Sequence, residues 1–129
     1  NFNLMKGKLP WPAKGKIVSS FGNKKNKKLN TITENLGIDI KTSKNKDIIA
    51  VLDGVVSTVT YIRGHGNIII LDHGDGFNTV YANIENIIIA ENDYIKAGRK
   101  IADVNDNMIL HFEIWANQKK LNPEKWLVK

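Results

Sequence analysis

The sequence predicts a single all-β domain, built from antiparallel sheets joined by short connecting loops. Apolar residues alternate with polar ones in short runs that are rich in Val and Ile, which is typical of half-buried strands. Gly, Asn or Asp interrupts these runs about every 8–12 residues, as expected where short strands are joined by turns. No segment keeps a helical period of about 3.6 residues over three turns.

Length and composition agree with one globular domain. The chain has 129 residues, of which 42% are hydrophobic and 25% charged, and this is enough for one core. No apolar run approaches the roughly 20 residues needed to span a bilayer. The absence of cysteine excludes disulfides and thiolate metal sites.

The order of elements follows from the apolar runs and the turn residues between them. Residues 1–8 are expected to be a linker stub, and residues 9–129 one domain. Asp53-Gly54 predicts a tight hairpin turn, and residues 64–66 and 74–76 predict two Gly-flanked turns. A short helical turn is expected at Pro123–Leu127, with Asn122 as its N-cap. The predicted strands are Lys16–Phe21, Leu36–Lys41, Val55–Ile62, Asn67–Asp72, Phe77–Ile84, Arg99–Val104 and Met108–Ala116.

The start of the chain carries no visible signal peptide and no initiator Met. We therefore expect an excised or processed domain, with any targeting segment outside it.

The charge balance favours an anionic partner. Lys and Arg outnumber Asp and Glu by 19 to 13, which gives a formal net charge of +6. The densest basic run, formed by Lys24, Lys25, Lys27 and Lys28, is expected to be a solvated loop that could bind an anionic polymer. Aromatic and basic residues do not alternate as in a nucleic-acid stacking platform, so nucleic acid is not expected as a partner.

The candidate site residues are a few histidines and one aspartate. His65 and His73 lie in the Gly-flanked turns and are expected to be ordinary turn residues. In the last long strand, alternation places Ile109, His111 and Glu113 on one face and Leu110, Phe112 and Ile114 on the core face. His111 could then line a groove, although a structural role stays open. Asp39 points away from Ile38 and Ile40, which should pack inward.

Several short motifs, taken in order, resemble one known family. They are GKIVSSFG (15–22), LGIDI (36–40), AVLDGVV (50–56), GHGNIIILDHGDG (64–76), TVYAN (79–83) and LHFEI (110–114), preceded by LPWP (9–12) and followed by NPEKWL (122–127). Together they resemble the LytM (lysostaphin-type) peptidase domain over nearly the whole chain. The resemblance implies that fold and a location in the cell envelope, in the periplasm.

The resemblance also shows which active-site residues differ. Active members of the family are expected to hold zinc with two histidines and an aspartate, and these positions fall on Asn35, Asp39 and His111. Two further catalytic histidines fall on Asn83 and Ile109. Only Asp39 and His111 keep the family's residue types.

These replacements predict a domain with neither zinc nor peptidase activity. Catalytic zinc usually needs three protein ligands, and an Asn amide is a poor substitute for imidazole. Asn83 cannot titrate and Ile109 has no polar side-chain atom, so general acid–base catalysis is lost. We therefore expect no cofactor. The loop 104–108 is shorter than in active members, which should leave the groove open.

The resemblance implies a non-catalytic LytM factor that binds and activates a peptidoglycan hydrolase, an amidase, during cell-wall remodelling or division. The partner groove would contain Asn35, Asp39, Asn83, Ile109 and His111. The alternative is a passive module that binds peptidoglycan or an anionic wall polymer through the four lysines. A third possibility, an active peptidase in which His65 or His73 replaces a lost ligand, has little support because both match ordinary turn positions.

The large aromatic residues are expected to be structural rather than functional: Trp11, Phe112 and Trp126. Trp11, between two prolines, should fasten the N-terminal segment to the sheet.

Overall fold

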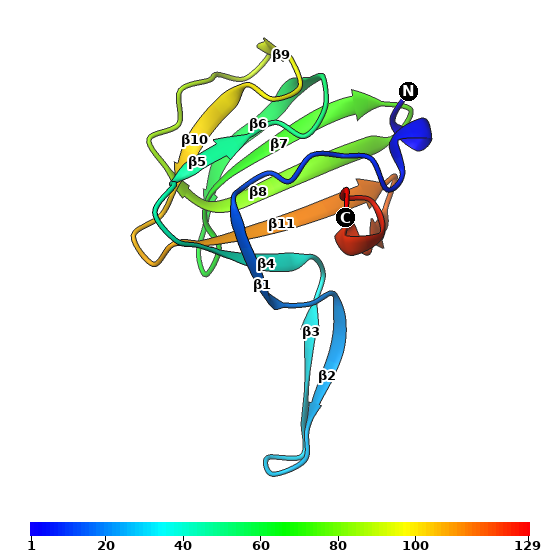
Figure 1. Cartoon of the computed structure of the whole chain (residues 1–129), viewed down its shortest axis with the longest axis vertical. Helices are drawn as coiled ribbons and strands as arrows, with labels where there is room; N and C mark the ends of the chain where they lie inside the picture. Colours follow the sequence, from blue (N-terminus) through cyan, green and yellow to red (C-terminus); the bar gives the residue numbers. More distant parts are fainter.

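The computed structural model describes all 129 residues and is almost entirely β-structure (Figure 1). The elements in chain order are η1 (Phe2–Met5), β1 (Gly15–Ser19), β2 (Gly22–Asn26), β3 (Thr31–Asn35), β4 (Ile38–Thr42), β5 (Asp47–Ile49), β6 (Gly54–Ile62), β7 (Gly66–Gly74), β8 (Phe77–Glu85), β9 (Tyr94–Ile95), β10 (Lys100–Val104), β11 (Ile109–Ala116), β12 (Lys119–Leu121) and η2 (Pro123–Lys125). The all-β prediction is confirmed.

Ten strands form one antiparallel sheet. Its main path runs β1-β4-β11-β8-β7-β6-β9, while β10 pairs with β5 and β8, and β12 pairs with β11. The remaining two strands, β2 and β3, pair only with each other and project from the body as a long hairpin (Figure 1). No helix in the structure is long and apolar enough to cross a membrane.

Alternation along β4 and β11 decides which side chains face the core. Ile38 and Ile40 of β4 are fully buried, and so are the side chains at positions 110, 112 and 114 of β11. The predicted core face of both strands is therefore confirmed. Their other face carries Asp39 and His111, because successive side chains of a strand point to opposite sides. Gly37 lets β4 begin directly against β11, since a Cβ there would collide with the carbonyl oxygen of Phe112.

The central strands β7 and β8 carry apolar residues on both faces. Ile69 and Tyr81 belong to the main core, whereas Ile68, Val80 and Ala82 form a small second cluster on the opposite face. This explains why these strands read as nearly continuous apolar runs rather than as clean alternation.

Two local predictions are wrong. The basic run was expected to be a loop, but Lys24 and Lys25 lie in β2, and Lys27 and Lys28 in the turn that follows it. Asp53-Gly54 is not a hairpin turn, because β5 pairs with β10 while β6 pairs with β7 and β9. The Asp53 carboxylate instead accepts hydrogen bonds from the Ala97 backbone N–H (2.7 Å) and the Tyr94 hydroxyl (3.1 Å).

The first eight residues, which the sequence suggested were a linker, pack against the domain. Phe2 is 1% exposed, stacks on Phe77 with ring centroids 4.6 Å apart and lies 5.2 Å from the Trp126 ring. Leu9 forms a β-bridge with Leu127. The two ends of the chain are therefore packed together.

Trp11 and the last turn behave as structural elements. Trp11 Nε1 donates to the Val128 carbonyl oxygen at 2.7 Å, so this residue fastens the N-terminal segment to the C-terminal one. The helical turn predicted near the C-terminus is η2, and the Asn122 side chain caps it by accepting from the Glu124 N–H at 3.0 Å.

Candidate functional site

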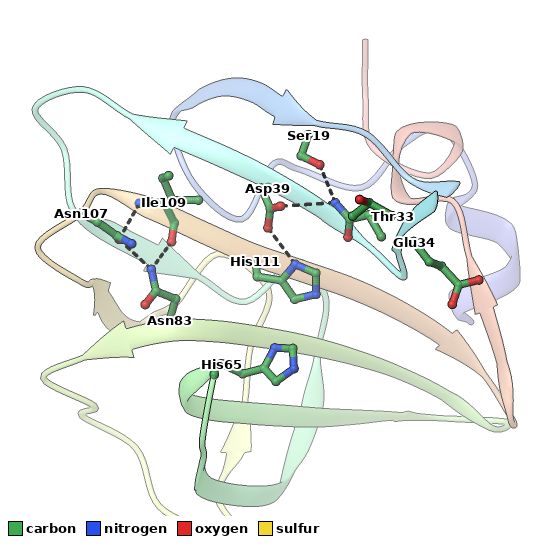
Figure 2. Close-up of a pocket in the computed structure, with 11 residues that line it drawn as sticks. Ser19, Thr33, Glu34, Asp39, His65, Asn83, Asn107, Ile109 and His111 are labelled. Carbon is green, nitrogen blue, oxygen red and sulfur yellow. Dashed lines mark hydrogen bonds and ion pairs between the residues drawn. The ribbon is translucent and has the colours of Figure 1, made fainter. Parts of the chain in front are cut away.

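A cleft of about 410 Å³ opens on the face of the sheet opposite the main core, beside the base of the hairpin (Figure 2). The structure brings all five residues of the predicted groove together in its lining. The eleven lining residues are Ser19, Thr33, Glu34, Asn35, Asp39, Gly64, His65, Asn83, Asn107, Ile109 and His111.

Strand pairing explains how distant residues meet in this cleft. Asp39 lies directly opposite His111 in the β4–β11 register, and Ser19 lies opposite Asp39 in the β1–β4 register. Side chains opposite each other on one sheet face are within contact distance. Asp39, His111 and Ser19 therefore converge, as Figure 2 shows.

His111 is held between two carboxylates. Its Nδ1–H donates to Asp39 Oδ1 at 2.8 Å, and its Nε2–H donates to Glu113 Oε2 at 2.7 Å. Burial lowers the pKa of His111, but the hydrogen bonds and negative charges of the two carboxylates outweigh burial and raise the pKa to about 9. The imidazole is therefore a cation at neutral pH.

Glu113 extends this chain of contacts along β11. Its second oxygen accepts from Trp115 Nε1 at 2.7 Å, and the Lys120 ammonium lies 3.8 Å from the Trp115 ring centroid. Burial raises the pKa of Glu113, but hydrogen bonds from His111 and Trp115 outweigh burial and hold its pKa below the usual range. Glu113 is therefore an anion that fixes the His111 ring.

Asn35 presents a donor to the site. Its Oδ1 accepts from the Gly37 backbone N–H at 3.0 Å, which fixes the orientation of the amide. Its Nδ2 then donates to Ser19 Oγ at 2.9 Å and to Asp39 Oδ2 at 3.3 Å. The amide nitrogen of Asn35 therefore points at the Asp39 carboxylate, the group that would have to bind a metal ion if one were held here.

These residues do not fit a zinc ion. Both ring nitrogens of His111 already contact carboxylates, and Asn35 offers an N–H where zinc needs a lone pair. No group of three or more His, Cys, Asp or Glu side chains is arranged to hold a metal.

Asn83 and Ile109 occupy the opposite end of the cleft. Asn83 has a positive φ of 66°, a conformation that Asn tolerates better than most residues. Its Nδ2 donates to the Ile109 carbonyl oxygen (2.6 Å) and to Asn107 Oδ1 (2.7 Å), so it ties the loop 105–107 to β11. Ile109 is half-buried and is the only hydrophobic residue in the lining.

Three residues that the sequence did not assign to the groove contribute charge or a second imidazole to this site. His65 reaches the cleft from the β6–β7 turn, with its ring centroid 6.0 Å from that of His111. Glu34 lines the cleft from β3, and Glu113 supports it from behind His111. Glu113 had a usable signal, because alternation puts it on the same strand face as His111. The positions of His65 and Glu34 depend on how distant strands pair.

His73 has a different environment from the turn that the sequence predicted. It lies in β7, and its ring nitrogens are hydrogen-bonded with the Asp53 carbonyl oxygen and Thr79 Oγ1, both at 2.7 Å. Burial lowers the pKa of His73, which favours the neutral ring. It does not line the cleft, and its hydrogen bonds hold Asp53 and Thr79 in place.

The four lysines of the predicted polymer-binding set lie outside the cleft. They surround a separate hollow on the hairpin, whose lining shares only Thr33 with the cleft. None of the four forms an ion pair.

Comparison with known sequences identifies the domain. The model of peptidase family M23 matches residues 33–123. Murein hydrolase activator NlpD of Escherichia coli (strain K12) is 38% identical over 122 residues, covering 91% of this chain and 30% of that protein. Outer membrane antigenic lipoprotein B of Haemophilus influenzae is 34% identical, covering 91% of this chain and 28% of that protein. The chain thus spans about 30% of the length of these relatives.

Solved structures support the fold. A zinc-containing peptidase from Vibrio cholerae superposes with a TM-score of 0.82 at 21% identity, covering 96% of this chain and 41% of that one. Csd3 of Helicobacter pylori also superposes with a TM-score of 0.82, at 23% identity, covering 94% of this chain and 35% of that one. The resemblance inferred from the ordered motifs is confirmed, and the chain belongs to peptidase family M23.

Proposed function

We propose that this chain is a non-catalytic M23 domain that binds and activates a peptidoglycan hydrolase, an amidase, in the periplasm. The observation that carries the proposal is that both ring nitrogens of His111 bond to carboxylates, those of Asp39 and Glu113, so neither nitrogen offers a lone pair to a metal. The names of several relatives, murein hydrolase activator and outer membrane lipoprotein, support the activator role and a cell-envelope location.

The chemistry of the cleft disfavours hydrolysis. Peptide-bond hydrolysis requires an activated water and a proton donor for the leaving amine. Asn83 cannot act as a general acid or base at neutral pH, and its amide nitrogen donates to the Ile109 carbonyl oxygen and to Asn107 Oδ1. Ile109 has no polar side-chain atom. The cleft is therefore suited to binding rather than to catalysis.

Binding can activate an enzyme when the partner prefers the enzyme's active conformation. The cleft would supply such binding energy if a segment of the hydrolase docked in it only in the active state. Ile109 is the apolar contact within a polar lining, and such residues dominate binding energy when a partner covers them.

The test is a reconstituted assay with purified amidases of the same genome, each acting on dye-labelled sacculi. Wild-type chain should increase dye release by its cognate amidase. Ile109→Asp should abolish this increase, because it would bury a carboxylate without a partner at the interface. Leaving a buried charge unpaired costs about 3–5 kcal/mol. Ile88→Asp is the matched control, since Ile88 is 57% exposed and outside the cleft. Loss of activation by both variants, or by neither, would contradict the cleft model.

The alternative is a passive wall-binding module, which the four unpaired lysines favour. Replacing Lys24, Lys25, Lys27 and Lys28 with Gln should then weaken sedimentation with purified sacculi in a salt-dependent way. If the lysine variant loses all function while Ile109→Asp still activates the amidase, the passive module replaces the activator.

A further inference from the structure

The β2–β3 hairpin is an arm with two exposed faces. Its strands pair only with each other, and its residues are exposed except at the base, where Gly22 and Asn35 are half-buried. A two-stranded hairpin of this kind is marginally stable by itself. Asn26 Oδ1 stiffens the tip by accepting from the backbone N–H groups of Lys28 (3.0 Å) and Leu29 (3.2 Å).

One face of this arm continues the cleft. In the hairpin register Gly22 lies opposite Asn35, and Lys24 lies opposite Thr33. Residues opposite each other share a face, and alternation puts positions 33 and 35 on the same side. Because Thr33 and Asn35 line the cleft, Lys24 lies on the outward extension of the same surface.

The hairpin as a whole is strongly basic. The hairpin carries four lysines and a single glutamate, Glu34, and none of the lysines has an ion-pair partner. The four lysines and Thr33 surround a hollow of about 570 Å³ without a hydrophobic residue in its lining. A ligand that crosses from the cleft onto the hairpin therefore meets a concentration of positive charge.

Exposed apolar side chains stand beside these lysines. Leu29 at the tip is 70% exposed. Ile32, opposite Lys25, is 69% exposed, but alternation places it on the other face of the hairpin from Lys24. A protein segment with acidic and apolar side chains would cover both kinds of surface. A hydrophilic wall polymer would neutralise the lysines but leave Leu29 in water.

We infer that the β2–β3 hairpin is the second half of the docking surface and binds an acidic segment of the partner hydrolase. The inference rests on the proposed function and adds a requirement on the partner's charge. The cleft determines where the partner docks, and the lysines attract its acidic segment and accelerate association.

The experiment measures the affinity of the chain for the purified amidase that it activates, at 50 mM and 500 mM NaCl. Lys24→Glu/Lys27→Glu reverses two charges in the hollow. Lys8→Glu/Lys96→Glu makes the same change in net charge at two exposed lysines outside the cleft and the hollow. Because all four side chains are exposed, melting temperatures should stay unchanged and show that each variant is folded.

At low salt the hairpin variant should bind the amidase about tenfold more weakly than wild type does. At high salt the difference should shrink to about threefold or less, because ions screen exposed charges. The control variant should bind like wild type. Equal weakening by both variants, or none by the hairpin variant, would overturn the inference.

Three further outcomes separate this inference from its alternatives. If the hairpin variant loses binding to sacculi or to phosphatidylglycerol vesicles while its affinity for the amidase is unchanged, the lysines bind the wall or a membrane and the inference is wrong. If Ile109→Asp abolishes amidase binding while the hairpin variant binds normally, the proposed function stands and only the hairpin inference fails. If the wild-type chain binds no amidase of its genome, both fail.

Discussion

His111 combines two roles at the scale of single residues. The family resemblance predicts a metal-ligand position here, yet in the structure the protonated ring of His111 acts as a cation between Asp39 and Glu113. Asn35 completes this arrangement by donating to Asp39 rather than accepting. A positive ring and an N–H donor thus balance the carboxylates, so a divalent cation is not needed to neutralise them.

A single substitution at Asn35 should give the domain an affinity for zinc. The wild-type domain, purified without chelator, should contain no stoichiometric zinc, whereas Asn35→His should bind zinc through three ligands, with Asp39 and His111. Elemental analysis and competition with a chromogenic chelator measure both. Stoichiometric zinc in the wild type would contradict the prediction, as would equal zinc content in Asn35→Ala and Asn35→His.

The ion pairs of His111 predict a characteristic dependence of stability on pH. Its pKa in the folded state is about 9, above the ordinary histidine value of 6.5. The stabilisation is therefore fully present below about pH 6.5 and is lost as pH rises through 9, with a magnitude on the order of 2 kcal/mol.

Denaturant unfolding at intervals between pH 6.5 and 9.5 measures this effect. Wild-type protein should lose more unfolding free energy over this range than His111→Gln, whose side chain does not titrate. Parallel profiles for the two proteins would show that His111 is neutral in the fold.

Among the elements, β11 has a different role on each of its two faces. Leu110, Phe112 and Ile114 lie in the core, while His111 and Glu113 belong to the site. The hairpin β2–β3 is the opposite case, because neither of its faces is packed. Substitutions should therefore have very different effects in these two elements.

Phe112 and Ile32 test this contrast. Phe112→Ala should lower the unfolding free energy by about 3–5 kcal/mol, because a fully buried aromatic ring leaves a cavity. Ile32→Ala, on the exposed hairpin, should change it by about 0.5 kcal/mol or less. Chemical denaturation measures both, and an unchanged midpoint for Phe112→Ala would mean that the two faces of β11 are reversed.

In the molecule as a whole, the two ends of the chain pack against each other. Phe2 packs against both Phe77 and Trp126, and Trp11 Nε1 donates a hydrogen bond to the Val128 carbonyl oxygen. These contacts connect the first and last segments to the same side of the domain and keep the N-terminal residues from being a free linker.

Removing the Phe2 ring should therefore destabilise the domain. Phe2→Ala should cost about 3–5 kcal/mol, because the ring is almost completely buried in the main core. Leu4→Ala is the control in the same segment, since Leu4 is 73% exposed. If both variants melt like wild type, residues 1–8 contribute nothing to the fold and are a linker, as the sequence suggested.

Particular residues show how much the sequence determined by itself. The alternation of β4 and β11 was enough to predict that positions 38, 40 and 112 are buried and that Asp39 and His111 face the other way, because side-chain direction in a strand is a local property. The ordered motifs were enough to identify the family. That Asn35, Asn83 and Ile109 replace its active-site residues stays a prediction from the resemblance.

The tertiary structure decided what depends on pairing between distant segments. The pairing of β5 with β10 contradicts the expected turn at Asp53-Gly54. The basic run, expected to be a loop, belongs to the projecting β2–β3 hairpin. The folding of the chain ends brought Phe2 into the core, and the β6–β7 turn brought His65 to the cleft. Alternation says which way a side chain points, but not which strand lies beside it. The register between strands is set by packing of the whole core, and that is why the sequence alone could not supply it.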